Sequence, residues 1–302
     1  MPQGQLDLSV ACQRHRLGRV TFTPPTAYAD ASCLHVERIE NDTTARRFVE
    51  LHHYARTFPA AIASFGMFET SPSAPAMLVG VATFSVPMNV ARSTAALLRP
   101  GEAVCELGRF TLLDRIGHGA ETRMLSLARA GLGQAKTYHC PTANAERPKY
   151  PIIVSFSDPV PRADHHGTLI HVGHLGRVYQ GGIDGGAGTG MGLYTGRGAA
   201  KTMWLTPDAS AFVDRTLNKL RNGEVGDAGV YDQLLRHGAP LIRKGETGRD
   251  YVTRALRDGP FRRVHHRGTH RYLFLAGSRS RKRELATALG PGLPYPRWTD
   301  AP

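Results

Sequence analysis

Residues 105–120 read CELGRFTLLDRIGHGA, and this stretch decides the predicted fold. Its apolar first half predicts a β-strand over 104–113. Gly117 and Gly119 then lead into an amphipathic stretch that predicts a helix over 120–136. A glycine-bearing loop that opens a helix directs backbone N–H groups at an anion, and phosphate is a common ligand of such loops. The alternative interpretation is an ordinary turn between a strand and a helix.

The residues before this stretch predict one helix and three strands. Asn41 is a favourable helix N-cap, and apolar residues at helical spacing follow it until about Tyr54. We expect strands over 34–39, 62–69 and 77–84, with a hairpin joining the last two.

The residues after it are more irregular. Residues 151–157 form a short continuous apolar run, which is typical of a buried central strand. Residues 181–198 hold nine glycines in eighteen positions, so we expect a loop there and no packed element. Further along, the patterns predict helices over 207–222 and 226–237, a strand over 271–276 and a helix over 278–289.

The chain carries a formal net charge of +13 over 302 residues, and most of the excess lies near the C-terminus. Residues 243–283 contain thirteen Lys and Arg against three acidic residues, a net charge of +10 (13 − 3). Clustered arginines with aromatic residues between them favour contact with a nucleic acid, and a solvated basic tail is the alternative. The residues that we expect to contact phosphates are Arg262, Arg263, Arg267 and Arg271.

Membrane and export signals are missing from the sequence. No stretch reaches the roughly 18 apolar residues of a membrane span, and the N-terminus lacks the basic and apolar regions of an export signal. The cysteines are widely spaced and form no Cys-x-x-Cys motif. We therefore expect a cytoplasmic protein that does not bind membranes; the sequence leaves its oligomeric state open. Reduced, buried thiols are expected at Cys12, Cys33, Cys105 and Cys140.

The order of these elements indicates an α/β fold and is similar to that of GNAT-type acetyltransferases. In that fold a mixed central sheet is flanked by helices, and the loop after the fourth strand holds the pyrophosphate of the donor. We expect residues 1–33 to be a lead-in and 34–200 to be an acetyltransferase-like core that includes the glycine-rich loop 181–198. Residues 201–302 would form a basic, helical C-terminal extension that completes the core.

A set of short motifs narrows the family. In order along the chain they are Leu51–Tyr54, Phe65–Phe68, Leu78–Val81, Glu106–Phe110, Ile153–Pro159, Val178–Gln180, His270–Leu273 and Leu293–Arg297. Together they resemble the phage Mu Mom-like DNA-modification family, over 34–200 and 265–297. The chain departs from the family pattern at 118–122, and its segment between 158 and 179 is longer.

This resemblance implies an acetyltransferase-like enzyme that transfers a small acyl-derived group, of carbamoylmethyl type, to the exocyclic amine of a DNA base. The modification protects phage DNA from restriction, which implies the cytoplasm of a bacterial host. The resemblance also implies acetyl-CoA, or another acyl or aminoacyl donor, and iron as cofactors. Because bases in duplex DNA are stacked, such an enzyme has to flip its target out or act on a single strand.

The catalytic candidates are Ser157, Asp158 and Tyr179. Asp158 follows the apolar strand, at the end of a sheet where α/β folds place their sites, and can accept a proton from the base amine. The alternative is a turn formed by Asp158 and Pro159. Ser157 belongs to the same matching motif. The resemblance implies that Tyr179 contacts the flipped base or donates a proton to the leaving thiolate, and a core aromatic is the alternative.

The loop and the strand before it supply the candidate donor contacts. A buried arginine within a strand needs an anionic or carbonyl partner, and for Arg109 the choices are donor phosphate and Glu106. The residues that we expect to bind the donor are Arg109, Arg115, Gly117, Gly119 and Ala120.

Histidines form two groups of interest. His53 and Tyr54 end the first helix, and with Asp158 they make up the iron-ligand set that the resemblance implies. A hydrogen-bonded histidine at a helix end is the alternative. The second group has a spacing that permits metal binding, but we interpret it as solvated loop histidines near a polyanion. Its members are His165, His166, His171 and His174.

Two other functions stay open. One is a GNAT-type N-acyltransferase that acts on a small-molecule or protein amine and has no need of the basic C-terminal segment. The other is a non-catalytic DNA-binding protein built on the same fold.

Overall fold

The structure is a computed structural model that describes residues 29–296 with several gaps. The residues outside the description are 1–28, 88–91, 114, 118, 135–138, 141–142, 147–148, 164, 168, 172, 175, 181–191, 210, 224–227, 267 and 297–302. Among the described residues, no helix has the length and apolar character needed to cross a membrane.

The chain divides into two compact units. The first, here called the sheet unit, contains the described residues up to Asp158, His174–Arg197, and those from Thr269 onward. The second, here called the inserted unit, contains Pro159–Gly173 and Gly198–Gly268. The chain passes between the two units four times. The units therefore contain other residues than the predicted ranges 1–33, 34–200 and 201–302.

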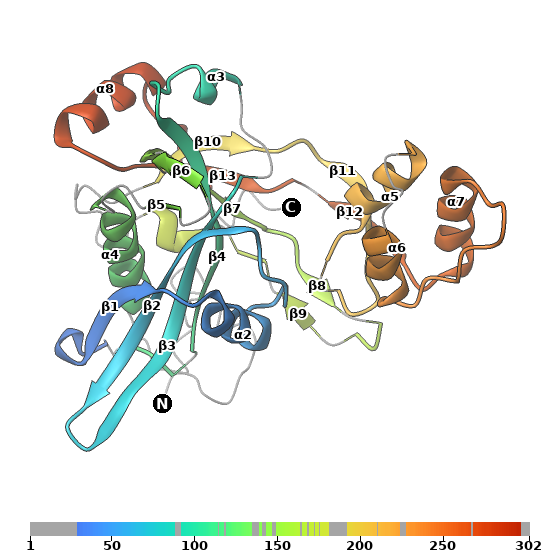
Figure 1. Ribbon diagram of the computed structural model, residues 1–302, viewed down its shortest axis with the longest axis horizontal. Coiled ribbons are helices and arrows are strands. Elements are labelled where there is room, and N and C mark those ends of the chain that lie inside the picture. Colours follow the sequence, from blue (N-terminus) through green and yellow to red (C-terminus); the bar gives the residue numbers. More distant parts are fainter. Residues whose placement is uncertain are drawn as a thin grey trace, which may run out of the picture. The chain divides into compact units, whose positions relative to one another are not determined.

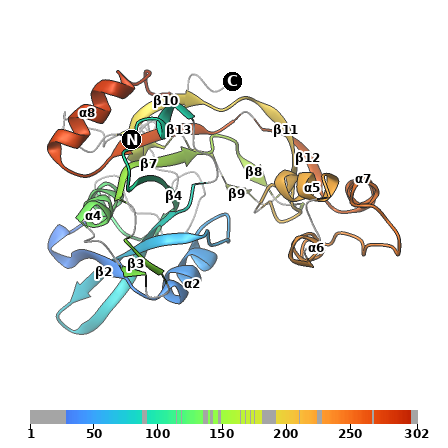
Figure 2. The same ribbon diagram turned by 45° about the horizontal axis from the view of Figure 1, so that its top comes forward.

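A seven-stranded sheet forms the sheet unit, in the order β1-β2-β3-β4-β7-β13-β10. Every neighbouring pair is antiparallel except β4 and β7, which run parallel. Two views show that β13, from the end of the chain, lies between β7 and β10 (Figure 1 and Figure 2). The fold is therefore α/β with a mixed central sheet, as predicted. The strands span Leu34–Ile39 (β1), Ala61–Ser71 (β2), Ala74–Ser85 (β3), Glu102–Leu112 (β4), Lys149–Ser157 (β7), Leu193–Arg197 (β10) and His270–Leu275 (β13).

Helices cover both faces of this sheet. On β7, Ile153 packs in the core beneath α4, whereas Ile152 and Val154 pack with Leu285 of α8. Successive strand residues point to opposite faces, so α4 and α8 lie on opposite sides. Helix α2 packs on Val81 of β3, on the side away from α4. These helices span Asp42–His52 (α2), Ala120–Gln134 (α4) and Arg279–Leu289 (α8).

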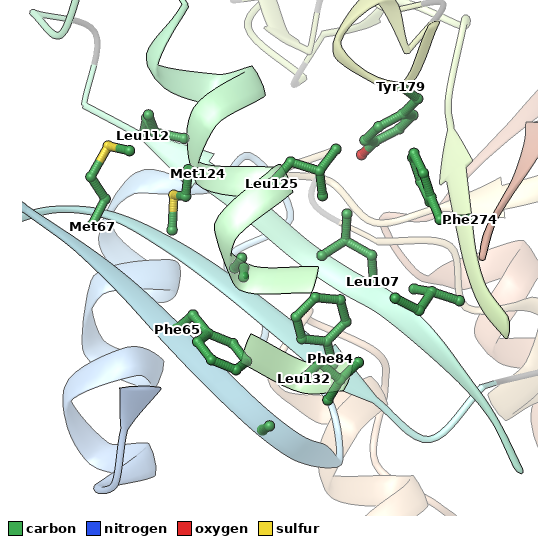
Figure 3. Close-up of a cluster of buried hydrophobic side chains, with 14 of the residues drawn as sticks. Phe65, Met67, Phe84, Leu107, Leu112, Met124, Leu125, Leu132, Tyr179 and Phe274 are labelled. Carbon is green, nitrogen blue, oxygen red and sulfur yellow. The ribbon is translucent and has the colours of Figure 1, made fainter. Parts of the chain in front are cut away.

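The largest core lies between α4 and the sheet. Met124, Leu125 and Leu132 of α4 meet Phe65 and Phe84 of the sheet in one cluster of buried apolar side chains (Figure 3). Each such side chain, fully buried, contributes about 1.5–3 kcal/mol of transfer free energy. This core fixes the helix that follows β4, and with it the end of the glycine-bearing loop.

The prediction that no packed element occurs within 181–198 is wrong for its last residues. Strand β10 pairs with β13, and Tyr194 is buried against it. Gly196 lies at the irregularity in that pairing with a φ of +113°, a conformation that glycine tolerates. Tertiary pairing therefore overrides the local glycine content. Residues 181–191 lie outside the described part of the chain.

The inserted unit has its own core. Its helices α5 and α7 contribute Leu217, Leu220, Tyr251, Val252 and Ala255 to one buried apolar cluster. Three helices and two two-stranded sheets, β8-β9 and β11-β12, are described in it. They span Arg162–Ala163 (β8), Leu169–His171 (β9), Lys201–Leu205 (β11), Asp214–Arg221 (α5), Ala228–Leu235 (α6), Gly248–Asp258 (α7) and Arg262–His266 (β12).

Two helix predictions differ from the inserted unit. The helix predicted over 207–222 begins only at Asp214, because Thr206 and Ala211 close a turn with an N–H···O bond of 3.0 Å. Helix α7 was not predicted. Its start is a reciprocal cap, in which the Thr247 hydroxyl accepts from the Asp250 N–H (3.2 Å) and donates to the Asp250 carboxylate (2.6 Å).

The remaining described elements are short. They are the 3₁₀ turns Ala31–Cys33 (η1) and Arg177–Gln180 (η2), helix Arg92–Ala95 (α3), and the strands His139–Cys140 (β5) and Ala143–Glu146 (β6), which pair with each other.

Candidate active site

The candidate site lies where β4 and β7 stop pairing. Their parallel ladder runs from Glu102 opposite Lys149 to Glu106 opposite Val154. Beyond that point β4 continues to pair only with β3, and β7 only with β13 as far as Ser157. The two strands therefore separate just before the Ser-Phe-Ser-Asp sequence of β7.

Polar side chains occupy one face of the sheet at this point. Ser157 lies opposite His270 on β13, and Ser155 lies opposite Tyr272. Tyr194 of β10 is the next partner of Tyr272. Directly opposed residues of neighbouring strands share a face, and so do alternate residues of one strand. All five side chains are buried, on the face that α4 covers.

Contacts join these side chains into one cluster. The Tyr194 hydroxyl lies 2.9 Å from His270 Nδ1, and the Gln180 amide donates to the Tyr272 hydroxyl at 3.1 Å. The ring of Tyr179 lies 5.4 Å from that of Tyr272, centroid to centroid. By hydrogen-bond geometry the Ser155 and Ser157 hydroxyls have no partner among the described residues, although each lies beside a phenol.

Gly176 brings Tyr179 against β7. Its φ is +68°, and a Cβ placed there would lie 2.6 Å from Tyr179 Cδ2 and 3.2 Å from Ser157 Cβ. The Tyr179 N–H donates to the Gly176 carbonyl at 2.8 Å, and the His174 N–H donates to the Asp158 carbonyl at 2.7 Å. Ser157, Asp158 and Tyr179, the three predicted catalytic residues, therefore lie in one cluster.

Burial sets the protonation states in this cluster. It raises the pKa of Tyr179 to about 12 and also raises the pKa of Tyr272. Burial and, to a lesser extent, the charge of Arg197 lower the pKa of His270 to about 4, against the opposing effect of Asp158. At neutral pH the cluster thus holds protonated phenols and a neutral imidazole beside a carboxylate. Such a set can donate a hydrogen bond at one point and accept a proton at another.

Arg109 binds the loop that follows α2. Its Nε donates to the Thr57 carbonyl (2.7 Å), and a terminal nitrogen donates to the Thr57 hydroxyl (2.6 Å). Tyr54 interacts electrostatically with both Arg109 and Tyr179, which places Tyr54 close to the cluster. Arg109 also interacts with Glu106, as one predicted alternative had it. Its predicted contact with a donor stays a prediction.

The predicted donor loop lies between β4 and α4. Ile116 is buried and its N–H donates to the Leu113 carbonyl at 3.1 Å, which anchors the loop. Gly119 has a φ of +86° with open space around it, and α4 begins at the next residue, Ala120. Arg115 pairs with Glu69 of β2 at 2.5 Å. The backbone at Gly119 is thus accessible, while the nearby arginine has a partner.

The predicted iron ligands do not meet as a set in the described contacts. His53 Nδ1 accepts from the Ala55 N–H at 3.1 Å, and its ring stacks on Tyr54 at 4.3 Å. Asp158 interacts with His270, in a contact that the sequence did not predict. Within the described residues, no group of three or more His, Cys, Asp or Glu side chains could hold a metal ion.

The second histidine group divides between the two units. His165 and His166 are exposed in the inserted unit, as interpreted from the sequence. His171 is fully buried there, so that interpretation is wrong for it; its strand β9 pairs with β8 and carries it inward. His174 belongs to the sheet unit, and its ring lies 6.4 Å from that of Tyr179.

The predicted DNA-contacting arginines are found in different settings. Arg263 is exposed on β12. Arg262 donates to the Ala163 carbonyl within the inserted unit. Arg271 donates to the Thr195 hydroxyl at 2.7 Å within the sheet unit. Arg267 lies outside the described residues. Their contact with DNA stays a prediction.

Tyr194, Gln180, His270 and Tyr272 were not assigned a role from the sequence. Three of them lie in the quoted motifs Val178–Gln180 and His270–Leu273, so the motifs were a usable signal. What the sequence could not supply was the order β7-β13-β10, which places them beside Ser157.

The comparison with protein families agrees with the motifs. A model described as the Mom protein family matches residues 33–182, about half of the chain. The match includes Ser157, Asp158 and Tyr179 and ends before Tyr194 and His270. A search of curated proteins finds no match. The chain therefore belongs, through residues 33–182, to the Mom protein family, the phage DNA-modification family that its motifs resemble.

Proposed function

We propose that this protein is a Mom-like transferase that adds a small acyl-derived group, of carbamoylmethyl type, to the exocyclic amine of a DNA base. The observation that carries this proposal is the packing of Ser157 and Tyr179 around Gly176, next to Asp158, within the segment that matches the family. Buried groups with shifted pKa values beside a break in a sheet are typical of a reaction site.

The side chains have complementary parts in this proposal. An exocyclic amine must lose a proton when it forms a new bond, and Asp158 or the neutral imidazole of His270 accepts it. Tyr179 stays protonated because burial holds its pKa at about 12, so its hydroxyl donates. Ser155 and Ser157 add two hydroxyls that can orient a bound group.

A phosphate-bearing acyl or aminoacyl donor would supply the transferred group; acetyl-CoA itself could supply only an acetyl group, because it lacks the amide nitrogen of a carbamoylmethyl group. The loop before α4 suits the donor's phosphates, because Gly119 leaves the backbone open and the N-terminus of a helix attracts an anion by about 0.3–1 kcal/mol. Two features oppose this fit: Arg115 is paired with Glu69, and Glu121 places a negative charge in the first turn. Donor binding in this proposal therefore rests on backbone N–H groups more than on arginine.

Iron has no assigned step in this proposal. One nitrogen of His53 already accepts from a backbone N–H, and Asp158 is coupled to His270. Iron binding by His53, Tyr54 and Asp158 therefore stays a prediction, and the proton transfers above are assigned to protein groups.

A GNAT-type N-acyltransferase acting on a small-molecule or protein amine is the second candidate. It is favoured by Arg262 and Arg271, which are hydrogen-bonded within the fold and so are less available to DNA. Binding of acetyl-CoA without any mass change in DNA would support this candidate instead.

The test is made in bacteria that produce the full chain. Plasmid DNA is digested to nucleosides, and their masses are compared with those from cells carrying an empty vector. We expect a new, heavier nucleoside and reduced cleavage of the plasmid by restriction enzymes. If the protein is soluble and every nucleoside has its ordinary mass, the proposed function is wrong.

A further inference from the structure

The segment between α6 and α7 exposes two neighbouring apolar side chains. Leu241 is 75% exposed and Ile242 is 44% exposed. Among the described residues, these are the only two large exposed apolar side chains adjacent in the chain. Single exposed apolar residues are ordinary on protein surfaces, but a neighbouring pair in a loop requires an explanation.

This loop is held firmly in place. Arg254 of α7 donates to the Leu241 carbonyl at 2.7 Å and to both carboxylate oxygens of Glu246, at 2.7 and 2.6 Å. Glu246 in turn accepts from the Arg243 N–H at 2.9 Å. The side chains of Arg254 and Glu246 are only 9% and 8% exposed, so the clamp lies beneath the loop. Leu241 and Ile242 are therefore presented outward by a fixed backbone.

The clamp persists at physiological pH. Hydrogen bonds from Arg254 hold the pKa of Glu246 at about 2, so this carboxyl stays ionised throughout the neutral range. A bidentate arginine–carboxylate pair of this kind fixes geometry as well as charge. The exposure of Leu241 and Ile242 therefore needs no rearrangement of the loop.

Cations lie near the exposed pair in the sequence. Residues 232–250 contain Arg236, Arg243, Lys244 and Arg249 against Asp232, Glu246 and Asp250, a net charge of +1 (4 − 3). Arg243 and Lys244 follow Ile242 directly, and both are exposed. An apolar pair with cations beside it suits a partner that has apolar surfaces between negative charges.

We propose that Leu241 and Ile242 form a wedge that inserts between base pairs of duplex DNA while Arg243 and Lys244 contact the adjacent phosphates. DNA-bending proteins insert aliphatic side chains between base steps in this way, at a cost of a few kcal/mol of unstacking per step. A protein partner fits less well, because two side chains cover far less than the about 1,000 Å² of a stable interface. The inference rests on the proposed function in that DNA is the substrate.

The probe is a set of short duplexes with 2-aminopurine at one position, since its fluorescence rises when neighbouring bases unstack. We expect the full chain at saturation to raise the fluorescence at one or more positions. Leu241→Ala/Ile242→Ala should bind with the same salt dependence but lose most of this rise. Val86→Ala, at a 60% exposed position in the sheet unit, is the matched control and should behave like the wild type.

The cations are tested separately. Arg243→Ala/Lys244→Ala should keep the rise at saturation but make the negative slope of log K against log salt shallower by about 1.8, since each phosphate contact contributes roughly 0.9 to its magnitude. An unchanged slope would overturn the phosphate contacts.

Three results would overturn the wedge. They are a wild-type chain that binds no duplex, binding without a fluorescence change at any position, and a full rise in Leu241→Ala/Ile242→Ala. If that double substitution instead abolished self-association in solution, the exposed pair would belong to an interface between two copies. Nucleoside masses from plasmid DNA keep the two proposals apart: modified DNA without unstacking contradicts only the wedge, and unstacking without modified DNA contradicts only the proposed transferase.

Discussion

Replacing Gly176 by alanine tests the geometry of the candidate site more sharply than removing any of its polar groups. The backbone at Gly176 has a φ of +68°, a region that alanine adopts at a cost of about 1–2 kcal/mol. Its new Cβ would lie 2.6 Å from Tyr179 Cδ2, 3.0 Å from Tyr272 Cε2 and 3.2 Å from Ser157 Cβ. Overpacking of a filled core costs about 1–3 kcal/mol more. The free energy of unfolding should therefore fall by about 2–5 kcal/mol.

Gly101→Ala is the matched control for this substitution. Gly101 has a similar φ of +76°, but a Cβ there would meet nothing within 4 Å. Only the backbone cost applies, so the loss should be about 1–2 kcal/mol. The difference between the two variants measures the packing around Tyr179, independently of the strain that both share.

Urea denaturation followed by circular dichroism measures both losses, and the plasmid-nucleoside assay is run on the same variants. We expect Gly176→Ala to lose more stability than Gly101→Ala and also to lose modified nucleoside, because Tyr179 and Tyr272 must move. Equal losses of stability in the two variants would refute the close approach of Gly176 to Tyr179, and with it the described cluster.

Three further predictions concern other parts of the chain. Between pH 7 and pH 4 the wild type should lose about 3 kcal/mol more stability than His270→Gln. The reason is that the imidazole of the unfolded chain, with a pKa near 6.5, takes up a proton before that of the folded chain, with a pKa of about 4. Equal pH dependence of the two proteins in urea titrations would contradict this. Glu246→Gln should speed trypsin cleavage after Arg243 and Lys244, since it weakens the clamp from Arg254; an unchanged rate in limited proteolysis would argue against the clamp. Burial raises the pKa of the Cys105 thiol, so this thiol should react with an alkylating agent only in urea. The half-buried Cys33 should react both in the native protein and in urea, and peptide mapping after alkylation distinguishes the two.

Local signals in the sequence predicted much of the sheet unit. The strand over 34–39 matches β1 residue for residue, and the N-cap at Asn41 is confirmed by its side chain, which accepts from the Thr43 N–H at 2.8 Å. The apolar run 151–157 is confirmed as the core of β7, a central strand. Each of these features depends on neighbouring residues alone, so periodicity and capping were sufficient.

Features that depend on distant contacts were not predicted. Strand β10 forms within a glycine-rich segment only because β13 pairs with it. The chain leaves the sheet unit after Asp158 and returns at His174; the sequence marked the segment between 158 and 179 as longer than in the family, but not that it joins a second unit. The cysteines show the same limit: Cys105 is buried as expected, whereas Cys33 is only half buried.

The candidate site was likewise predicted only in part. The motif around Ser157 and Asp158 and the match at Tyr179 identified residues that the structure brings together. His270 and Tyr194 complete the cluster only through the order of strands that are far apart in sequence. For Arg109 the predicted alternatives were donor phosphate and Glu106; its guanidinium donates to Thr57 in the loop after α2 and also interacts with Glu106.

The most direct test of the central claim compares two tyrosine variants by the amount of modified nucleoside in plasmid DNA. Tyr179→Phe removes one hydroxyl from the cluster, and Tyr231→Phe removes one from the core of the inserted unit as a matched control. A positioned proton donor contributes about 100-fold or more to a reaction rate, so Tyr179→Phe should lower the amount by about that factor while Tyr231→Phe leaves it unchanged. Equal amounts of modified nucleoside in the two variants would contradict the assignment of the reaction to this cluster.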